Sequence, residues 1–333
     1  MSPIRAVSAQ SWVTMRNVGD ADPVSIVVPV FNSQESLPVL FQRITDVLAA
    51  ERREFELILV DDCSRDGSWS VVTALARDHS HVRGFRMLRN FGQHNALLCG
   101  IRAARHPTVV TIDDDLQNPP EEIPKLLARL DADADVVYGT PRAESHGLWR
   151  DLASQITKLV LHGAMGAETA RKVSAFRVFR RHVARAFDEY RSPYVSIDVL
   201  LTWGTQRFAA VTVRNDPRPY GVSSYTVAKL IRHALNMMTG FSVLPLQTAS
   251  MLGFAMTGGG ACALAWVLGR YLIYGSVVPG FAFLGCMIAI FSGAQLFALG
   301  IIGEYIARIH VRTMDRPSYV LETSTDERTH AAH

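Results

Sequence analysis

The sequence has few cysteines, and no two of them lie close enough for a CxxC metal or redox motif. Two fall in the polar first part of the chain and two in the apolar last part, which argues against a disulfide framework: Cys63, Cys99, Cys262 and Cys286. Because disulfide frameworks belong to oxidising environments, their expected absence suits a reducing compartment for the polar part of the chain. The first 22 residues also lack the basic start and apolar run of a signal peptide. We therefore expect the polar part to stay in the cytoplasm.

An excess of charge of either sign is also missing. The formal net charge of the 333 residues is only +3, which leaves no electrostatic footprint for nucleic acid on the chain as a whole. No nucleic-acid partner is expected. The charges are unevenly distributed, because residues 234–269 and 271–303 contain no Asp, Glu, Lys or Arg.

Each uncharged stretch is long enough for a helix that crosses a bilayer, which needs about 20 apolar residues. We predict a membrane segment at 242–303 with crossings at 246–268 and 278–302. Lysines and arginines flank the pair, and only Arg270 lies in the connection. The positive-inside rule then places both ends, including a tail at 304–333, in the cytoplasm of a multi-pass inner-membrane protein. The alternative is two buried helices of a soluble core, in which such long uncharged runs are rare.

Before the apolar part, short β-branched runs alternate with segments of helical spacing. This alternation over residues 23–225 predicts an α/β domain with a mostly parallel, doubly wound sheet, preceded by a loose tail at 1–22. Residues 226–241 form either an amphipathic helix on the membrane surface or a helix packed on the domain. The predicted strands are 24–30, 55–60, 82–87, 109–112 and 135–138, and the predicted helices are 35–50, 69–77, 95–105 and 121–130.

Three consecutive carboxylates follow the fourth predicted strand, at Asp113, Asp114 and Asp115. Side chains two apart on an extended segment point the same way, so Asp113 and Asp115 are expected to face one site while Asp114 points elsewhere. Gln117 continues the same parity. Oxygen ligands of this kind suit Mg²⁺ or Mn²⁺. The alternative is a solvated acidic turn before a helix.

Polar segments also follow the first three predicted strands, where a doubly wound sheet binds its ligands. They are Val28-Pro29-Val30-Phe31-Asn32, Asp61-Asp62-Cys63-Ser64-Arg65-Asp66-Gly67 and Arg89-Asn90-Phe91-Gly92-Gln93-His94. Carboxylates among turn-forming residues can bind a nucleoside, Gly92 permits close backbone approach, and Arg89 can contact a phosphate. The same segments also suit ordinary strand-to-helix turns, with Ser68 as a helix N-cap.

In this order, the motifs resemble family 2 glycosyltransferases of the GT-A fold over about residues 23–320. The similarity is closest to the polyprenyl-phosphate glycosyltransferases, the group that includes dolichol-phosphate mannose synthase. The GQH at 92–94 and the DLQNPPEE at 115–122 are similar to the bacterial undecaprenyl-phosphate 4-deoxy-4-formamido-L-arabinose transferases. Two membrane helices followed by GEYIARI at 303–309 belong to the same pattern, as does RPYGVSSY at 218–225.

The resemblance implies a metal-dependent transfer of a sugar, with inversion, from a nucleoside-diphosphate donor to a polyprenyl phosphate, in particular undecaprenyl phosphate. Relatives form oligomers, so a homo-oligomer in the lipid bilayer is expected. The expected catalytic residues are Asp113, Asp115 and Arg142, and the metal ligands are Asp113, Asp115 and Gln117. The expected nucleotide-binding residues are Pro29, Asn32, Glu35, Asp61, Asp62, Asp66, Arg89, Gly92 and Asp114. The expected lipid-phosphate contacts are Arg142, Arg150, Ser154, Arg177, Arg218, Ser223 and Tyr225.

Two departures from the family pattern stand out. Cys63 replaces a usual glycine, and Ala175 stands before Phe176 where relatives often have aspartate, which leaves the acceptor side and the sugar preference open. A processive polysaccharide synthase is an alternative, but it needs more membrane spans and a QxxRW motif. A non-catalytic membrane scaffold is another, against which the intact acidic motif argues. The sugar, the nucleotide base, the lipid length and the choice of metal are open.

Overall fold

The structure is a computed structural model that describes residues 22–141, 173–217, 219, 244–275 and 281–326. The predicted amphipathic helix at 226–241 and nearly all of the predicted tail at 1–22 lie outside these residues. The same holds for six of the expected lipid-phosphate contacts: Arg142, Arg150, Ser154, Arg218, Ser223 and Tyr225.

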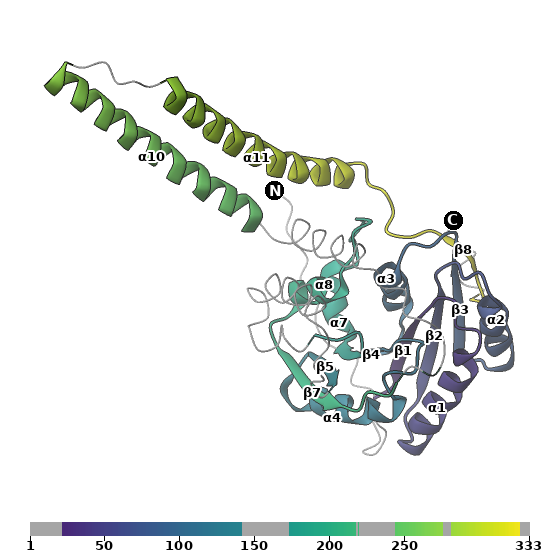
Figure 1. Ribbon diagram of the computed structural model, residues 1–333. Coiled ribbons are helices and arrows are strands. Elements are labelled where there is room, and N and C mark those ends of the chain that lie inside the picture. The colour runs from purple at the N-terminus through teal and green to yellow at the C-terminus, as the bar shows by residue number, and fades with distance from the viewer. Residues whose placement is uncertain (1–21, 142–172, 218, 220–243, 276–280, 327–333) are drawn as a thin grey trace, which may run out of the picture.

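Within the described part of the chain, eight strands form one sheet (Figure 1). They are β1 (Val24–Val30), β2 (Phe55–Asp61), β3 (Val82–Met87), β4 (Thr108–Thr111), β5 (Val136–Pro141), β6 (Arg177–Arg180), β7 (Phe208–Val213) and β8 (Leu321–Ser324). Their order is β7-β5-β6-β4-β1-β2-β3-β8. β1 pairs in parallel with β2 and β4, β2 with β3, and β5 with β7, whereas β6 and β8 are antiparallel to their neighbours. The prediction of a mostly parallel α/β sheet is confirmed.

Helices cover both faces of this sheet. The described helices of the domain are α1 (Ser36–Ala50), α2 (Ser68–Asp78), α3 (Gln93–Ala103), η1 (Pro120–Glu122), α4 (Ile123–Asp133), α7 (Arg181–Ala184), η2 (Arg185–Phe187) and α8 (Ile197–Gly204). Successive strand residues point to opposite faces, so β1 contributes Ile26 and Val28 to a core with α1 and α4 and contributes Val27 to a second core with α3 and α8. Burial on both faces explains why the central strands are continuous apolar runs.

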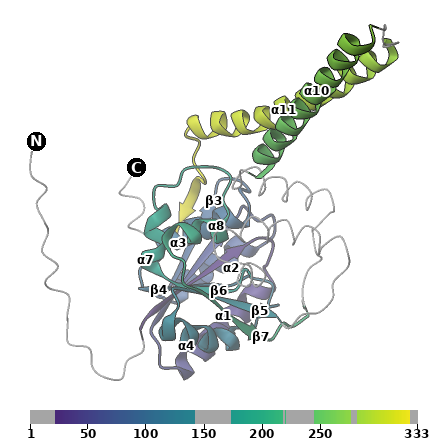
Figure 2. The ribbon, with the colours of Figure 1, turned by 90° about the vertical axis from the view of Figure 1, so that its left-hand side faces the viewer.

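Two long helices, α10 (Leu244–Tyr274) and α11 (Phe281–Thr313), lie side by side and project away from the sheet (Figures 1 and 2). Both are long and apolar enough to cross a membrane. They pack closely at Gly260, where an added Cβ would lie 2.8 Å from the ring of Phe291. Most of their large apolar side chains are exposed, including Phe254, Leu272 and Ile309. The two uncharged stretches are therefore helices without a protein core of their own, which argues against the soluble alternative.

After α11 the chain returns to the sheet, where β8 pairs antiparallel with the edge strand β3. Asp326 then lies against Arg83, with its Oδ2 at 2.5 Å from Nη2, and Arg83 also pairs with Glu56 at 2.8 Å. The sequence predicts only a tail at 304–333 after the membrane segment. A four-residue strand with little apolar character has no recognisable alternation, so the return to the sheet has no sequence signal.

Candidate functional site

Four loops meet at the carboxyl edge of β1, β2, β3 and β4, and hydrogen bonds tie them together. Asn32, with φ 55°, donates its backbone N–H to Ser64 Oγ at 2.9 Å and accepts from the N–H of Arg65 through Oδ1 at 2.8 Å. Asparagine tolerates this left-handed conformation better than most residues. The side chain expected to bind nucleotide thus holds the β1 and β2 loops at a fixed separation.

Asp66 makes a second connection between these loops. Its Oδ2 accepts from the N–H of Gln34 at 3.1 Å, and its Oδ1 accepts from the N–H of Ser68 at 3.0 Å. Helix α2 begins at Ser68, so the predicted N-cap is the first helical residue, and the carboxylate two residues earlier satisfies its amide. In the structure Asp66 orders the rim of the site; its contact with nucleotide stays a prediction.

Asp62 holds the loop after β3. Its side chain is almost fully buried, and its two oxygens accept from the N–H groups of Phe91 at 2.6 Å and Gly92 at 2.8 Å. Gly92 has φ 97°, which favours glycine, and α3 starts at the next residue. Burial raises the pKa of Asp62 to about 6, and the two amide hydrogen bonds only partly oppose it. Arg89, exposed at this rim, stacks on the Phe91 ring at 4.3 Å.

Hydrogen bonds from the surrounding loops satisfy the carboxylate of Asp61 only in part. It is fully buried, and its Oδ1 accepts from the N–H of Ser64 at 3.2 Å. Its Oδ2 has no hydrogen-bond partner among the described residues, although Arg86 Nε lies 3.4 Å away. Burial raises the pKa of Asp61. A buried acceptor without a partner costs stability, so this atom is a candidate acceptor for a ligand N–H.

The acidic motif is a turn and not an extended segment. β4 ends at Thr111, Asp114 and Asp115 lie in a turn, and buried Leu116 has φ 60°. The alternation argued from the sequence is therefore wrong as a reason for the side-chain directions. What distinguishes Asp114 from Asp113 and Asp115 is its hydrogen bonding. Its Oδ2 accepts from the N–H of Phe31 at 3.0 Å and from the hydroxyl of Ser33. This contact anchors the β1 loop to the β4 loop, and burial raises the pKa of Asp114 to about 6.

The expected metal ligands Asp113, Asp115 and Gln117 are all half-buried at this edge. Gln93 Nε2 donates to Asp113 Oδ1 at 2.6 Å, and the N–H of Gln117 donates to Asp115 Oδ1 at 3.1 Å. The described residues contain no group of three or more His, Cys, Asp and Glu that could hold a metal. Mg²⁺ typically takes one or two protein carboxylates and completes its shell with water and substrate phosphate. By donor type, two carboxylates and an amide oxygen suit a cation that is shared with a phosphate ligand, and their role as metal ligands stays a prediction.

The other expected site residues have different surroundings. Pro29 is buried inside β1, and Glu35 is exposed just before α1. Arg177 is 1% exposed and pairs with Asp198, which also accepts from the Tyr138 hydroxyl at 3.2 Å. Arg177 is therefore not a solvated surface charge, and its contact with a lipid phosphate stays a prediction. No sequence signal links these three residues, because they come from β5, β6 and α8.

His94 also contacts this part of the domain. The N–H of Ile197, the first residue of α8, donates to His94 Nδ1 at 3.4 Å. The contact joins α3 to α8 near the carboxyl edge. It gives His94 a structural role between these two helices.

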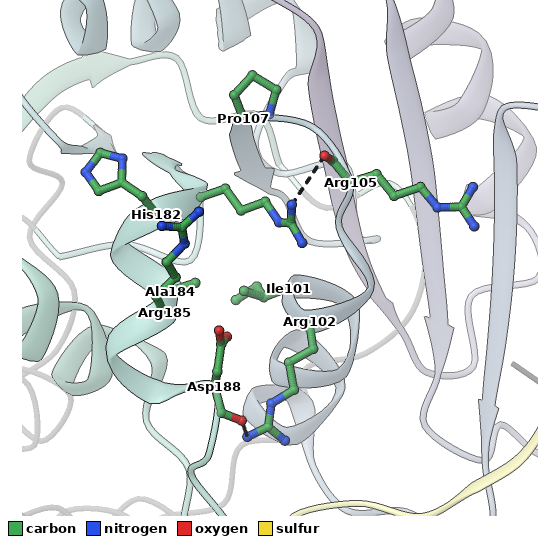
Figure 3. A pocket seen from close by; sticks show the side chains of 9 residues that line it. Ile101, Arg102, Arg105, Pro107, His182, Ala184, Arg185 and Asp188 are labelled. Carbon is green, nitrogen blue, oxygen red and sulfur yellow. Dashed lines mark hydrogen bonds between the residues drawn. The ribbon is translucent and has the colours of Figure 1, made fainter. Parts of the chain in front are cut away.

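A cavity of about 380 Å³ lies away from this site (Figure 3). It is enclosed by Arg102 and Pro107 on one side and by Arg181, Arg185 and Asp188 on the other. Arg102 lies in the last turn of α3, Pro107 directly precedes β4, and the other three follow β6, so the cavity lies at the amino end of β4. Its arginines already bind backbone: Arg102 donates to the carbonyl of Asp188 at 2.7 Å, and Arg181 to that of Arg105 at 3.4 Å. The cavity is not the place where the sequence motifs meet.

A mostly parallel sheet with carboxylates and glycine-containing turns at its carboxyl edge has the architecture of a nucleotide-binding α/β enzyme. The sequence model of Glycosyl transferase family 2 matches residues 25–187. The chain belongs to this family and is a glycosyltransferase. The GT-A fold expected from the motifs is confirmed.

Relatives match almost the whole chain. The undecaprenyl-phosphate 4-deoxy-4-formamido-L-arabinose transferase of Shewanella sediminis is 34% identical over 311 residues, which cover 92% of this chain and 94% of the relative. The protein with the same name from Yersinia pestis is 35% identical and covers 90% and 92% of the two chains. A solved structure, glucosyl-3-phosphoglycerate synthase of Mycobacterium tuberculosis with Mn²⁺, UDP and phosphoglyceric acid, has a TM-score of 0.49 at 16% identity and covers 68% and 83%.

Proposed function

We propose that this glycosyltransferase moves a sugar from a nucleoside diphosphate to a polyprenyl phosphate, with undecaprenyl phosphate as the expected acceptor. The observation that carries the proposal is the presence, on one chain, of the carboxyl-edge acidic site and of two exposed apolar helices. The names of the relatives, matched over more than nine-tenths of their length, support the same acceptor.

The donor is held from both ends. Asp61 Oδ2, buried and without a hydrogen bond, accepts from an N–H of the nucleobase. At the other end Asp113, Asp115 and Gln117 are the residues that would hold Mg²⁺ or Mn²⁺. When bound, the cation neutralises the charge that the diphosphate develops as it leaves. Asp62, Asp66 and Asp114 act differently, since their hydrogen bonds keep the surrounding loops in place before the donor arrives.

The acceptor phosphate needs little activation, because its second pKa is near ~6 and it is anionic at neutral pH. It attacks the anomeric carbon from the side opposite the leaving diphosphate, so the sugar is transferred with inversion. Arginine pairs bidentately with phosphate, and Arg142 is the next residue in the sequence after β5, which ends at Pro141. We assign it the phosphate contact, supported by Arg150, Ser154, Arg177, Arg218, Ser223 and Tyr225.

The membrane location follows from the helix surfaces. Exposed side chains such as Phe254, Leu272 and Ile309 would cost free energy in water, whereas a bilayer buries them. Near the end of α10, the Arg270 guanidinium lies over the rings of Trp266 and Tyr274 at 5.4 and 5.7 Å, a composition that suits a membrane–water interface. The protein is then a multi-pass inner-membrane enzyme with a cytoplasmic catalytic domain, and we keep the homo-oligomer as a prediction.

The deciding experiment measures release of nucleoside diphosphate from a panel of nucleotide sugars, with and without undecaprenyl phosphate. We expect release only when the lipid is present, together with one lipid-linked sugar per nucleotide released. Release without the lipid, or formation of a polymer, would refute the acceptor. Absence of release with every donor would favour the non-catalytic scaffold.

Arg142→Ala is expected to raise the KM for undecaprenyl phosphate about tenfold to a hundredfold, because a charge-assisted hydrogen bond to the acceptor is lost. Donor affinity, measured by calorimetry without the lipid, should stay within about twofold. Arg129→Ala on the outer side of α4, where Arg129 pairs with Asp133, is the matched control. Equal losses in donor and acceptor affinity would refute the acceptor role.

Donor affinity is expected to fall as the pH decreases from about 7 to about 5, with a midpoint near the raised pKa of Asp62, about 6. Protonation converts one oxygen into an O–H, which no longer accepts from the N–H of Phe91 or Gly92. Because the folded carboxyl binds its proton more tightly than the unfolded one, the same shift lowers the unfolding free energy as the pH rises toward about 6.

The Asp62→Asn variant tests this assignment. Its amide carries an NH₂ in place of one acceptor oxygen at every pH, so donor affinity should be low, and the decrease that Asp62 causes between pH 7 and pH 5 should be absent. Calorimetric titrations at several pH values, with wild type alongside, provide the measurement. If the variant kept the wild-type pH profile, Asp62 would not be the group that titrates.

A further inference from the structure

Arg86, near the end of β3, lies between two carboxylates from distant parts of the sequence. Its Nε is 3.4 Å from Asp61 Oδ2 and 3.3 Å from Oε2 of Glu322, which belongs to β8. Neither contact is a hydrogen bond, and both Nε of Arg86 and Oδ2 of Asp61 are buried without a hydrogen-bond partner among the described residues. The guanidinium also lies over Trp69 at 5.9 Å. Its charge is therefore shared between the two carboxylates.

A bulge in β8 places Glu322 in this position. Arg86 is opposite Thr323 and Met87 is opposite Leu321, so Glu322 is the extra residue between two regular pairs. β-bulges redirect side chains and often occur next to active sites. In a regular antiparallel ladder, the residue between Leu321 and Thr323 would point to the other face of the sheet. The bulge instead brings its carboxylate to Arg86.

The segment after the bulge is firmly attached. The N–H of Thr325 donates to the carbonyl of Gly84 at 2.9 Å, and the N–H of Gly84 donates to Thr325 Oγ1 at 2.8 Å. Asp326 pairs with Arg83 and with Arg105. These contacts fix the register of β8 on β3, so the position of Glu322 is set by the fold and not by its own exposed ion pair.

We propose that Glu322 is a positioning residue of the donor site, which restrains Arg86 so that Oδ2 of Asp61 stays available to an N–H of the donor nucleobase. This inference rests on the proposed nucleotide-donor function. It gives the segment that follows α11 a part in donor recognition. Without Glu322, Asp61 is the remaining carboxylate beside the Arg86 Nε, and the guanidinium moves onto the atom that the nucleobase needs.

The test uses the full-length chain in detergent and titrates UDP, GDP, CDP and ADP by calorimetry. Glu322→Gln should weaken the best-bound nucleoside diphosphate about fivefold, which corresponds to one exposed ion pair, and should leave kcat at saturating donor nearly unchanged. Glu322→Asp keeps the carboxylate and should restore most of the affinity. Glu51→Gln makes the same charge change at the exposed end of α1 and should have no effect.

A second pair of variants shows whether Glu322 acts through Arg86. In an Arg86→Gln background, Glu322→Gln should add less than about twofold, because its partner is absent. If wild type binds a nucleoside diphosphate and Glu322→Gln binds it equally well, the positioning role is refuted. A loss of the same size with and without Arg86, or a loss that Glu322→Asp does not restore, also refutes it. If wild type binds none of the four nucleotides, the proposed function itself fails.

Discussion

Asp115→Asn is expected to lower turnover with Mg²⁺ or Mn²⁺ by roughly three orders of magnitude. In the proposed function, a cation held by Asp113, Asp115 and Gln117 would supply several kcal/mol of charge stabilisation to the departing diphosphate, and each ~1.4 kcal/mol changes the rate about tenfold. Asparagine preserves the shape of the side chain but removes the negative charge that holds the cation. The fold should be unaffected, because the turn at 114–115 is also held by Asp114 through Phe31 and Ser33.

Two measurements separate loss of the cation from loss of the fold. Mn²⁺ binding in the presence of a nucleoside diphosphate, followed by electron paramagnetic resonance, should weaken in Asp115→Asn, while the thermal unfolding midpoint changes little. Asp46→Asn provides the control, because Asp46 lies on α1, where it accepts an exposed hydrogen bond from Gln42. Unchanged turnover and unchanged Mn²⁺ binding in Asp115→Asn would exclude Asp115 as a ligand.

Asp326→Ala is expected to destabilise the catalytic domain by about 2–4 kcal/mol. The side chains of Arg83 and Asp326 are only 11% and 12% exposed, and breaking a buried ion pair leaves a charge without its partner. Glu56 still neutralises part of the Arg83 charge, since it also pairs with Arg83 at 2.8 Å. For a domain of this size we expect the thermal midpoint to fall by about 5–15 °C.

The control for this prediction comes from the same C-terminal segment. Asp315 pairs with Arg191 at 3.4 Å, but both side chains are about two-thirds exposed or more, so Asp315→Ala should change stability by less than ~0.5 kcal/mol. Thermal unfolding of both variants in the same detergent gives the comparison. Equal midpoints for Asp326→Ala and wild type would show that β8 is not an integral part of the domain.

The stability of the Asp326→Ala variant also tests where the catalytic domain ends. The alternation of strands and helices in the sequence predicts a glycosyltransferase domain that ends at residue 225, but β8 at Leu321–Ser324 is hydrogen-bonded to β3. A chain that stops before β8 would expose the edge of β3 and leave Arg83 without Asp326. We therefore expect the stable catalytic unit to require residues up to 326 in addition to 23–225.

The sequence by itself determined the regular elements and the order of the motifs. Strand β1 begins and ends where its apolar run does, β3 has the predicted bounds, and α1 starts within one residue of the prediction. These signals are local, because burial on both faces of the sheet requires continuous apolar residues and helical packing requires their spacing. The uncharged stretches likewise predicted α10 and α11, since long apolar segments need no information from the rest of the chain.

Only the tertiary structure decided what each carboxylate of the motifs does. Asp62, Asp66 and Asp114 accept backbone hydrogen bonds from neighbouring loops, while Asp61 keeps a buried oxygen without a partner. The role of Glu322 depends on a bulge and on Arg86, more than 200 residues earlier in the chain. Such roles depend on which atoms fill the hydrogen-bonding positions of a buried group, and residues far apart in sequence supply those atoms.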